Sequence, residues 1–141
     1  MVCGGGAGVM EAACEGFVIA RDELGSGRNL ALGITPTDRE DWANPHVDIV
    51  IPTGMGWARN AVITRTAWAV IAVGGCAGTL SELAFAWQMD KPIVAMNTTG
   101  GWAARLAGQS IDDRRPDTIM EAADAAQAIA LIKPRIEDKG K

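Results

Sequence analysis

The stretch AVIAVGGCAGTLSELAFAWQMDKPIVAM, residues 69–96, decides the fold of this chain. It begins with a short apolar run that contains β-branched residues, which is typical of a strand buried on both faces. A glycine loop follows at residues 74–78, and apolar residues then recur at helical spacing over residues 79–89. After a polar break, a second apolar run at residues 92–96 predicts another buried strand. Strand, glycine loop, helix and strand form the βαβ unit of a parallel sheet, whose loop lies where such folds bind ligands.

The remaining sequence continues this alternation of strands and helices. Apolar runs and turn signals predict the end of a strand and three further strands, at residues 1–3, 29–35, 47–52 and 118–122. Helical spacing predicts longer helices and one short helix, at residues 9–24, 57–67 and 123–133 and from Trp102 onward. Together these elements predict an α/β fold, Rossmann-like, with a mostly parallel sheet and helices on both faces. The polar segment between the first two full strands, residues 36–46, is predicted to be exposed and to act as a lid.

Length and composition indicate an ordinary globular protein. The 141 residues predict a single domain at residues 1–133, with Pro134 ending the last helix and residues 134–141 forming a flexible tail. No apolar run reaches about 18 residues and no signal peptide is recognised, so we expect a cytoplasmic protein with no membrane partner. The net charge of −4, without a basic cluster, argues against nucleic acid as the main partner. The three cysteines form no C-x-x-C pair, which predicts neither a disulfide framework nor a metal site.

Three glycine loops follow predicted strands, at residues 4–8, 74–78 and 98–101. The carboxyl ends of parallel strands lie at one edge of a sheet, so we expect these loops to converge there. Helix N-termini that follow such loops favour negative charge. The pattern predicts a site for a phosphate or another small anion. Trp102, directly after the third loop, is a candidate to flank a planar ligand.

Two charged side chains near these loops have both a structural and a functional interpretation. Glu82 stands three residues after Thr79, which matches the capping box in which both side chains bond backbone N–H groups at a helix start. Alternatively, Glu82 lies in the ligand space as a carboxylate that acts on substrate or water. Arg59 opens a predicted helix, where it either forms a surface salt bridge or holds a phosphate, with Asn60 as a neighbouring contact.

Five segments of the sequence, spread over most of the chain, resemble the LOG-like proteins. These are GGGAGVME at residues 4–11, RN at 59–60, GGCAGTLSE at 74–82, KP at 91–92 and TGGW at 99–102. The family includes cytokinin-activating nucleoside monophosphate phosphoribohydrolases and a branch of molybdenum cofactor carrier proteins. The resemblance implies a Rossmann-like fold, a homodimer or homotetramer, and a phosphate-bearing ligand such as a nucleotide or a molybdopterin-type cofactor. The residues that it assigns to the ligand are Gly5, Gly6, Gly8, Val9, Met10, Arg59, Asn60, Gly74, Gly75, Ala77, Gly78, Thr79, Glu82, Thr99, Gly100 and Gly101.

In the phosphoribohydrolases, the residues that match Arg59 and Glu82 are the catalytic pair that releases the base from a nucleoside 5′-monophosphate. The chain departs from that pattern, because Val73 replaces a proline before the loop and Cys76-Ala77 stands where the hydrolases have one residue. This longer loop resembles the carrier branch. Trp68 also replaces an aspartate, and the family's first strand, loop and helix have no counterpart, so we expect an N-terminally truncated family domain.

Three hypotheses about function therefore remain open from the sequence. The leading one is a protein of the carrier-like branch that binds a nucleotide or pterin phosphate. The second is a phosphoribohydrolase that uses Arg59 and Glu82 to hydrolyse the N-glycosidic bond. The third is an inactive fragment or interaction module. Only the second predicts base release, and the third predicts no ligand binding.

Overall fold

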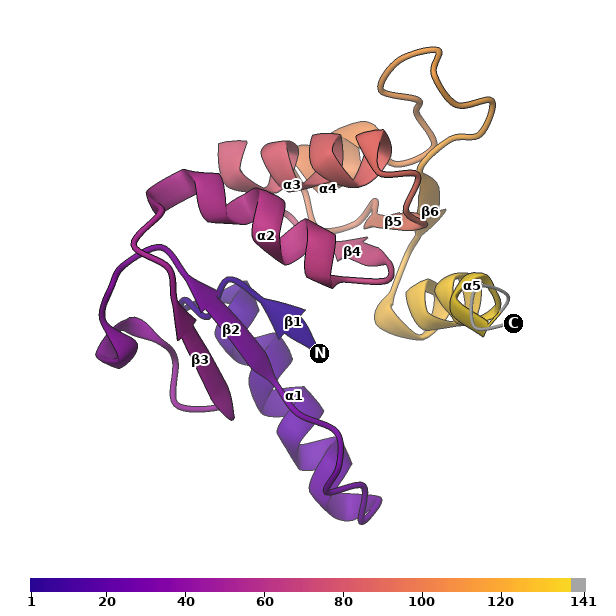
Figure 1. Cartoon of the computed structure of the whole chain (residues 1–141). Coiled ribbons are helices and arrows are strands. Elements are labelled where there is room, and N and C mark those ends of the chain that lie inside the picture. The colour runs from indigo at the N-terminus through magenta and orange to yellow at the C-terminus, as the bar shows by residue number, and fades with distance from the viewer. Residues whose placement is uncertain (138–141) are drawn as a thin grey trace. The chain divides into compact units, whose positions relative to one another are not determined.

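The computed structural model describes residues 1–137 and has the predicted α/β architecture (Figure 1). The chain divides into two compact units, Met1–Thr66 and Ala67–Lys141. Each unit contains one parallel three-stranded sheet.

The first unit is built on three parallel strands in the order β1-β2-β3. Val2 pairs with Leu32, and Leu32 pairs with Ile49, so that neighbouring strands point the same way. Parallel neighbours need crossover connections, and the helix between β1 and β2 provides the first of them. The elements of this unit are β1 (Val2–Cys3), α1 (Val9–Glu23), β2 (Leu32–Thr35), η1 (Glu40–Trp42), β3 (Ile49–Pro52), η2 (Gly56–Ala58) and α2 (Arg59–Thr66).

An ion pair joins the end of α1 to the start of the strands in this unit. Arg21 Nη1 lies 2.7 Å from Asp48 Oδ2, and the same carboxylate oxygen accepts a hydrogen bond from the Ala31 backbone N–H at 2.7 Å. Hydrogen bonds from Arg21 and then from Ala31 lower the pKa of the Asp48 carboxyl below its ordinary value of 3.8. Cys14, Ala31 and Ile34 are buried nearby and form part of the core.

The second unit carries helices on both faces of its sheet, as the sequence predicts for a doubly wound fold (Figure 1). Along β5, Ile93 and Ala95 belong to a buried cluster with side chains of α3 and α4, whereas Val94 belongs to a second cluster with α5. This alternation follows from the two-residue period of a strand. The elements are β4 (Val70–Ala72), α3 (Ala77–Gln88), β5 (Ile93–Met96), α4 (Gly101–Leu106), β6 (Met120–Ala122) and α5 (Ala125–Glu137).

Two predictions about helix ends are wrong. Helix α3 begins at Ala77, and its N-cap residue is Cys76 without a side-chain cap hydrogen bond, so Thr79 and Glu82 do not form a capping box. The positive φ angles of Gly74 and Gly75 turn the chain early enough for the helix to start before Thr79. At the other end of the chain, Pro134 lies inside α5 and does not end it.

Helix α5 tolerates Pro134 because the proline lies in its last turn, where the missing N–H removes one backbone hydrogen bond and the side chain is exposed. Residues 134–137 are therefore helical, and the rest of the predicted flexible tail, residues 138–141, lies outside the described residues. Within the described residues, no helix is both long and apolar enough to cross a membrane.

Candidate functional site

The first glycine loop, residues 4–8, lies directly against the guanidinium group of Arg59. A Cβ atom on Gly4 would overlap this group and would lie 2.6 Å from Arg59 Nη2. Arg59 is the first residue of α2 and only 5% exposed, with Asn60 beside it 3% exposed. The two predicted site residues of this helix are thus buried, and Arg59 is next to the first glycine loop. Arg59 is buried, which does not fit the structural interpretation of this residue as part of a surface salt bridge.

Asn44 is a residue of this site that the sequence did not reveal. Its side chain is buried and donates hydrogen bonds from Nδ2 to Gly5 O at 3.1 Å and to Gly6 O at 2.9 Å. Its backbone N–H also donates to Gly5 O at 2.7 Å. The segment at residues 36–46, predicted to be a lid, is therefore fixed to the first glycine loop at Asn44. A single asparagine in a polar segment gives no sequence signal for such a contact.

The second and third glycine loops lie together, as predicted for loops at one edge of a parallel sheet. Thr99 Oγ1 accepts a hydrogen bond from the Gly74 backbone N–H at 2.8 Å. The backbone N–H of Trp102 donates to Gly75 O at 3.1 Å, and that of Ala103 donates to Gly74 O at 2.9 Å. These contacts join the loop after β4 to the loop after β5. The convergence of the first loop with these two, which belong to the other unit, stays a prediction.

Helix α3 begins in this pair of loops with the features of an anion site. Its N-cap residue makes no side-chain hydrogen bond to the helix, and its first turn contains no acidic residue. Gly78 and Thr79 lie in that turn, and the Thr79 side chain packs against Gly75, where a Cβ atom would overlap it. Backbone N–H groups and the positive end of the helix dipole favour a negative ligand at such a start.

Helix α1 starts in a similar way after the first glycine loop. Its N-cap residue is Gly8, with φ of +70° and no side-chain cap hydrogen bond, and the predicted ligand residues Val9 and Met10 form its first turn. Glu11 in the same turn is acidic and opposes an anion there. The start of α3 is therefore the more favourable of the two for a phosphate group.

The remaining predicted residues of the second unit take distinct positions. Glu82 lies in the second turn of α3 and is half-buried, and it is not a capping residue. Gly100 is the N-cap residue of α4, with φ of +71° and no atom within 4 Å of its would-be Cβ. The ring of Trp102, a candidate to flank a planar ligand, has the Arg105 guanidinium 5.1 Å from its centroid on one face.

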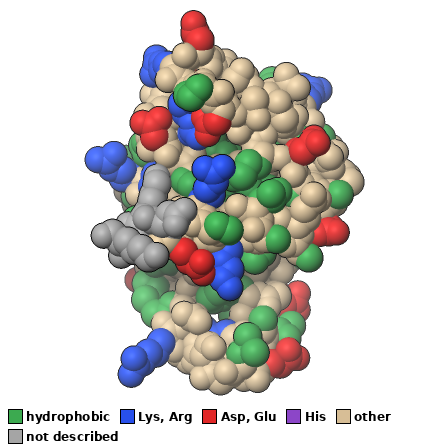
Figure 2. Space-filling view, turned by 90° about the vertical axis from the view of Figure 1, so that its right-hand side faces the viewer, with side chains coloured by type: hydrophobic (Ala, Val, Ile, Leu, Met, Phe, Trp, Pro, Cys, Tyr) green, Lys and Arg blue, Asp and Glu red, His purple; other side chains and the backbone are tan. Residues whose placement is uncertain are grey.

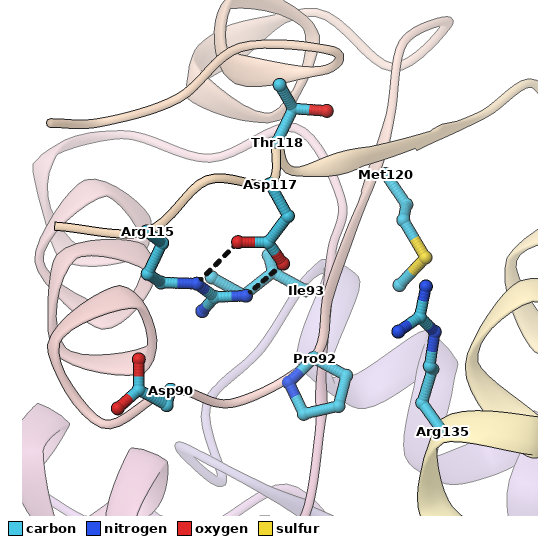
Figure 3. A pocket seen from close by; sticks show the side chains of 8 residues that line it. All are labelled: Asp90, Pro92, Ile93, Arg115, Asp117, Thr118, Met120 and Arg135. Atoms are coloured by element: carbon cyan, nitrogen blue, oxygen red, sulfur yellow. Dashed lines mark hydrogen bonds and ion pairs between the residues drawn. The ribbon is translucent and has the colours of Figure 1, made fainter. Parts of the chain in front are cut away.

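A pocket of about 420 Å³ lies at the opposite edge of the second sheet (Figure 3). It is bordered by the first residues of β5 and β6, Ile93 and Met120, whereas the glycine loops follow the last residues of β4 and β5. Figure 3 shows Arg115 and Asp117 as a bidentate pair on one wall, with distances of 2.9 Å and 2.6 Å. Arg135 lies on the other side of the pocket (Figure 3).

Arg115 is held in this pocket by contacts within the protein. Besides its pair with Asp117, Arg115 donates to the Lys91 carbonyl at 2.9 Å, and its guanidinium lies 4.5 Å from the Trp87 ring centroid. The hydrogen bond from Arg115 lowers the pKa of the Asp117 carboxyl, with a further contribution from the charge of Arg135. Because Arg115 is already paired with Asp117, it contributes little to binding an anion in this pocket.

Charges of both signs are scattered over the face of the molecule in Figure 2, where Lys and Arg side chains stand among Asp and Glu. Within residues 1–137, no group of three or more His, Cys, Asp or Glu side chains is placed to hold a metal ion.

Comparison with known proteins identifies related sequences and structures. The family model described as the SLOG cluster4 family matches residues 1–129. An uncharacterized protein of Archaeoglobus fulgidus is 38% identical over 96 residues, which are 68% of this chain and 58% of that protein. The chain thus spans less than two thirds of the length of this relative.

Three solved structures are similar to this chain over nearly its whole length. The X-ray structure of TM1055 matches with a TM-score of 0.80 and 29% identity, over 94% of this chain and 76% of that one. The molybdenum cofactor binding protein of the phototrophic bacterium Rippkaea orientalis matches with a TM-score of 0.75 and 30% identity, covering 96% and 76%. The molybdenum cofactor carrier protein of Chlamydomonas reinhardtii matches with a TM-score of 0.71 and 30% identity, covering 97% and 77%.

Proposed function

Because the chain belongs to the SLOG cluster4 family, with its Rossmann-like fold, we propose that it binds a small phosphate-bearing ligand at its glycine loops. The ligand is a nucleotide or a pterin cofactor. Two similar structures are named as a molybdenum cofactor binding protein and a molybdenum cofactor carrier protein, which supports the pterin class.

The start of α3 is the observation that carries this proposal. It combines a glycine loop, an N-cap without a side-chain hydrogen bond and a first turn without acidic residues. The hydrogen bond from Gly74 N–H to Thr99 Oγ1 holds the loop in place from the neighbouring loop. A pre-formed row of backbone N–H groups binds phosphate without the entropic cost of ordering long side chains.

Arg59 is the side chain that offers anion-binding chemistry in the first unit. A guanidinium group forms two parallel hydrogen bonds to a phosphate, and its burial strengthens their electrostatic energy. Gly4 leaves the space in which this guanidinium lies. We propose that Arg59 and Asn60 contact the anionic end of the ligand.

Thermal shift and isothermal titration calorimetry with AMP and with a pterin phosphate test the proposal. At a hundredfold excess over Kd, a single bound ligand adds about 2.7 kcal/mol, which raises Tm by roughly 10 °C for a chain of this size. Arg59→Ala should weaken binding at least tenfold. The matched control is Arg28→Ala, because Arg28 is exposed and precedes β2, at the opposite edge of the first sheet. If the folded protein gains no stability from either probe, the binding proposal is wrong.

Hydrolysis of nucleoside 5′-monophosphates is the second candidate function. Helix α3 begins before Thr79, so Glu82 is not part of a capping box there, and Arg59 is buried beside the first glycine loop. The resemblance implies a catalytic role for both side chains. A carboxylate can stabilise an oxocarbenium-like centre and orient water, so that AMP and water give adenine and ribose 5-phosphate. Adenine release, measured by chromatography, should then disappear in Glu82→Gln. Release that is unchanged by this substitution would exclude Glu82 as a catalytic residue.

The homodimer or homotetramer implied by the resemblance is also a proposal. Size-exclusion chromatography with light scattering on the full chain tests it. An elution mass of one chain at micromolar concentration would contradict it.

A further inference from the structure

Two cysteine thiols of the first unit lie in contact. The Cys3 and Cys14 sulfur atoms are 3.5 Å apart, although the two residues are eleven positions apart in the sequence. Cys3 is the last residue of β1, and Cys14 lies in the middle of α1. Both are free thiols, and Cys14 is fully buried whereas Cys3 is partly exposed.

The thiol pair lies directly beneath the first glycine loop. Cys3 precedes Gly4 in the chain, and its sulfur accepts a hydrogen bond from the Gly5 backbone N–H at 3.3 Å. The Asn44 side chain, which donates to the carbonyls of Gly5 and Gly6, also approaches the Cys14 sulfur at 3.9 Å. A change in the bonding of these sulfurs is therefore passed directly to the loop.

We propose that Cys3 and Cys14 form a reversible redox modification site that closes to an intramolecular disulfide. The sulfur atoms need to approach by about 1.5 Å to reach the S–S bond length of roughly 2.05 Å. Rotation of the two side chains within the existing contact supplies part of this approach. Strand β1 and helix α1, which carry the two cysteines, are already in contact through these sulfur atoms. The bond therefore does not require the unit to repack.

The oxidant is a low-molecular-weight disulfide such as oxidised glutathione. The Cys3 thiolate attacks one sulfur of this disulfide, which forms a mixed disulfide on Cys3 and releases one glutathione thiolate. The Cys14 thiolate then attacks the Cys3 sulfur, forms the Cys3–Cys14 bond and releases the second glutathione. In total the two protein thiols lose two protons and two electrons, which the oxidant gains.

The solvent exposure of the two thiols and the pKa of Cys14 determine which cysteine reacts first. Cys14 is inaccessible to a bulky oxidant, and burial, together with its hydrogen bond to Cys3, raises the pKa of its thiol to about 11. The nucleophile is the thiolate, so Cys14 reacts slowly with any external reagent. Cys3, the more exposed of the two, is the thiol that meets the oxidant first.

The disulfide should also alter ligand binding at the first glycine loop, a consequence that rests on the proposed function. Bond formation moves the Cys3 sulfur, which accepts the hydrogen bond from the Gly5 N–H, toward Cys14. Gly5 has φ of +72°, and a Cβ atom built on it would lie 3.0 Å from Thr35 Cγ2 and 3.4 Å from Gly33 Cα. The loop therefore has little room to adjust. We expect the oxidised protein to bind AMP at least tenfold more weakly than the reduced protein.

Mass spectrometry of the full chain tests the disulfide itself. Reduced protein is incubated with oxidised glutathione at pH 8.5, denatured, alkylated and digested. The expected product is a peptide pair linked through Cys3 and Cys14, which disappears after reduction. In Cys14→Ser, glutathione should stay attached to Cys3, and in Cys3→Ser, Cys14 should be recovered as an alkylated thiol. Recovery of wild-type Cys3 and Cys14 as two alkylated thiols, or of Cys3 still carrying glutathione, would overturn the proposal.

Titration with AMP before and after oxidation tests the consequence for the loop. Equal affinity of the two forms would refute the effect on binding while leaving the disulfide in place. Absence of AMP and pterin phosphate binding to the reduced form would instead count against the proposed function. The two failures are therefore distinguishable, because the linked peptide is detected without any ligand.

Discussion

Replacing Gly101 with alanine should destabilise the second unit because this glycine sits where two backbone segments meet. A Cβ atom on Gly101 would overlap Gly75 O and would lie 2.6 Å from the carbonyl carbon of Gly74. Both neighbours are backbone atoms, so no flexible side chain can move aside. Gly101 also has φ of +59°, which alanine adopts only with strain. The substitution therefore acts on the contact between the second and third glycine loops.

The magnitude follows from two separate terms. The positive φ costs about 1–2 kcal/mol for a residue with a Cβ, and forced overlap in a packed region costs about 1–3 kcal/mol. Gly101→Ala should thus lower the free energy of unfolding by about 2–5 kcal/mol. Gly108→Ala is the matched control in the same unit, because Gly108 has φ of +73° and its would-be Cβ meets only the Glu121 side-chain oxygen at 3.6 Å, an ordinary contact. It should incur only the first term, about 1–2 kcal/mol.

Urea denaturation followed by circular dichroism and tryptophan fluorescence measures both variants. The midpoint should fall without a change in the slope m, because the amount of surface exposed on unfolding is unchanged. The difference between the two variants, about 1–3 kcal/mol, is the energy of the overlap alone. Equal destabilisation by the two substitutions, within about 0.5 kcal/mol, would refute the proposed contact between the loops.

Further substitutions test the core, an acid titration and the position of Arg59. Trp87→Ala should lower the free energy of unfolding by about 3–5 kcal/mol in urea denaturation, because Trp87 is only 1% exposed. Trp57→Ala should change it by no more than about 0.5 kcal/mol, because Trp57 is 79% exposed. The hydrogen bond from Trp87 Nε1 at 2.7 Å lowers the pKa of the Asp112 carboxyl below 3.8. The stabilisation that this hydrogen bond gives the folded protein is therefore present above pH 3.8 and is lost as the pH falls further. Trp87→Phe should therefore lower the free energy of unfolding at pH 7. The difference in this free energy between wild type and variant should become smaller below pH 3.8 in the same assay. Gly4→Ala should change stability by less than about 1 kcal/mol, because the overlapping Arg59 side chain can move, yet calorimetry should show AMP affinity reduced as in Arg59→Ala.

The architecture was readable from the sequence because it depends on periodicity. The apolar run at residues 92–96 predicted a strand buried on both faces, and Ile93 and Val94 indeed pack on opposite sides of the sheet. The same holds for the helix predicted at residues 9–24, found at Val9–Glu23. Such patterns are local, so neighbouring residues carry the whole signal.

Contacts between distant residues were not readable in the same way. The thiol contact of Cys3 with Cys14 joins a strand to a helix, and Asn44 reaches a loop almost forty residues earlier in the chain. Neither produces a recurring pattern along the sequence. The false capping box has a different cause, because Thr79 and Glu82 have the correct spacing but the backbone begins the helix at Ala77. The sign of φ at the two preceding glycines decides this start, and the residue type permits either sign.

The glycine loops show why a glycine-rich sequence predicts a site better than it predicts the residues of that site. Gly4 leaves space for a guanidinium, and Gly101 leaves space for another loop, so both serve the protein's own packing. Gly8 and Gly100 have positive φ and open space where a Cβ would be, so the backbone is accessible there. At glycines of the second kind a ligand can approach the backbone closely. We therefore expect bulky substitutions at Gly8 to obstruct the ligand itself, whereas substitutions at Gly101 act through the fold.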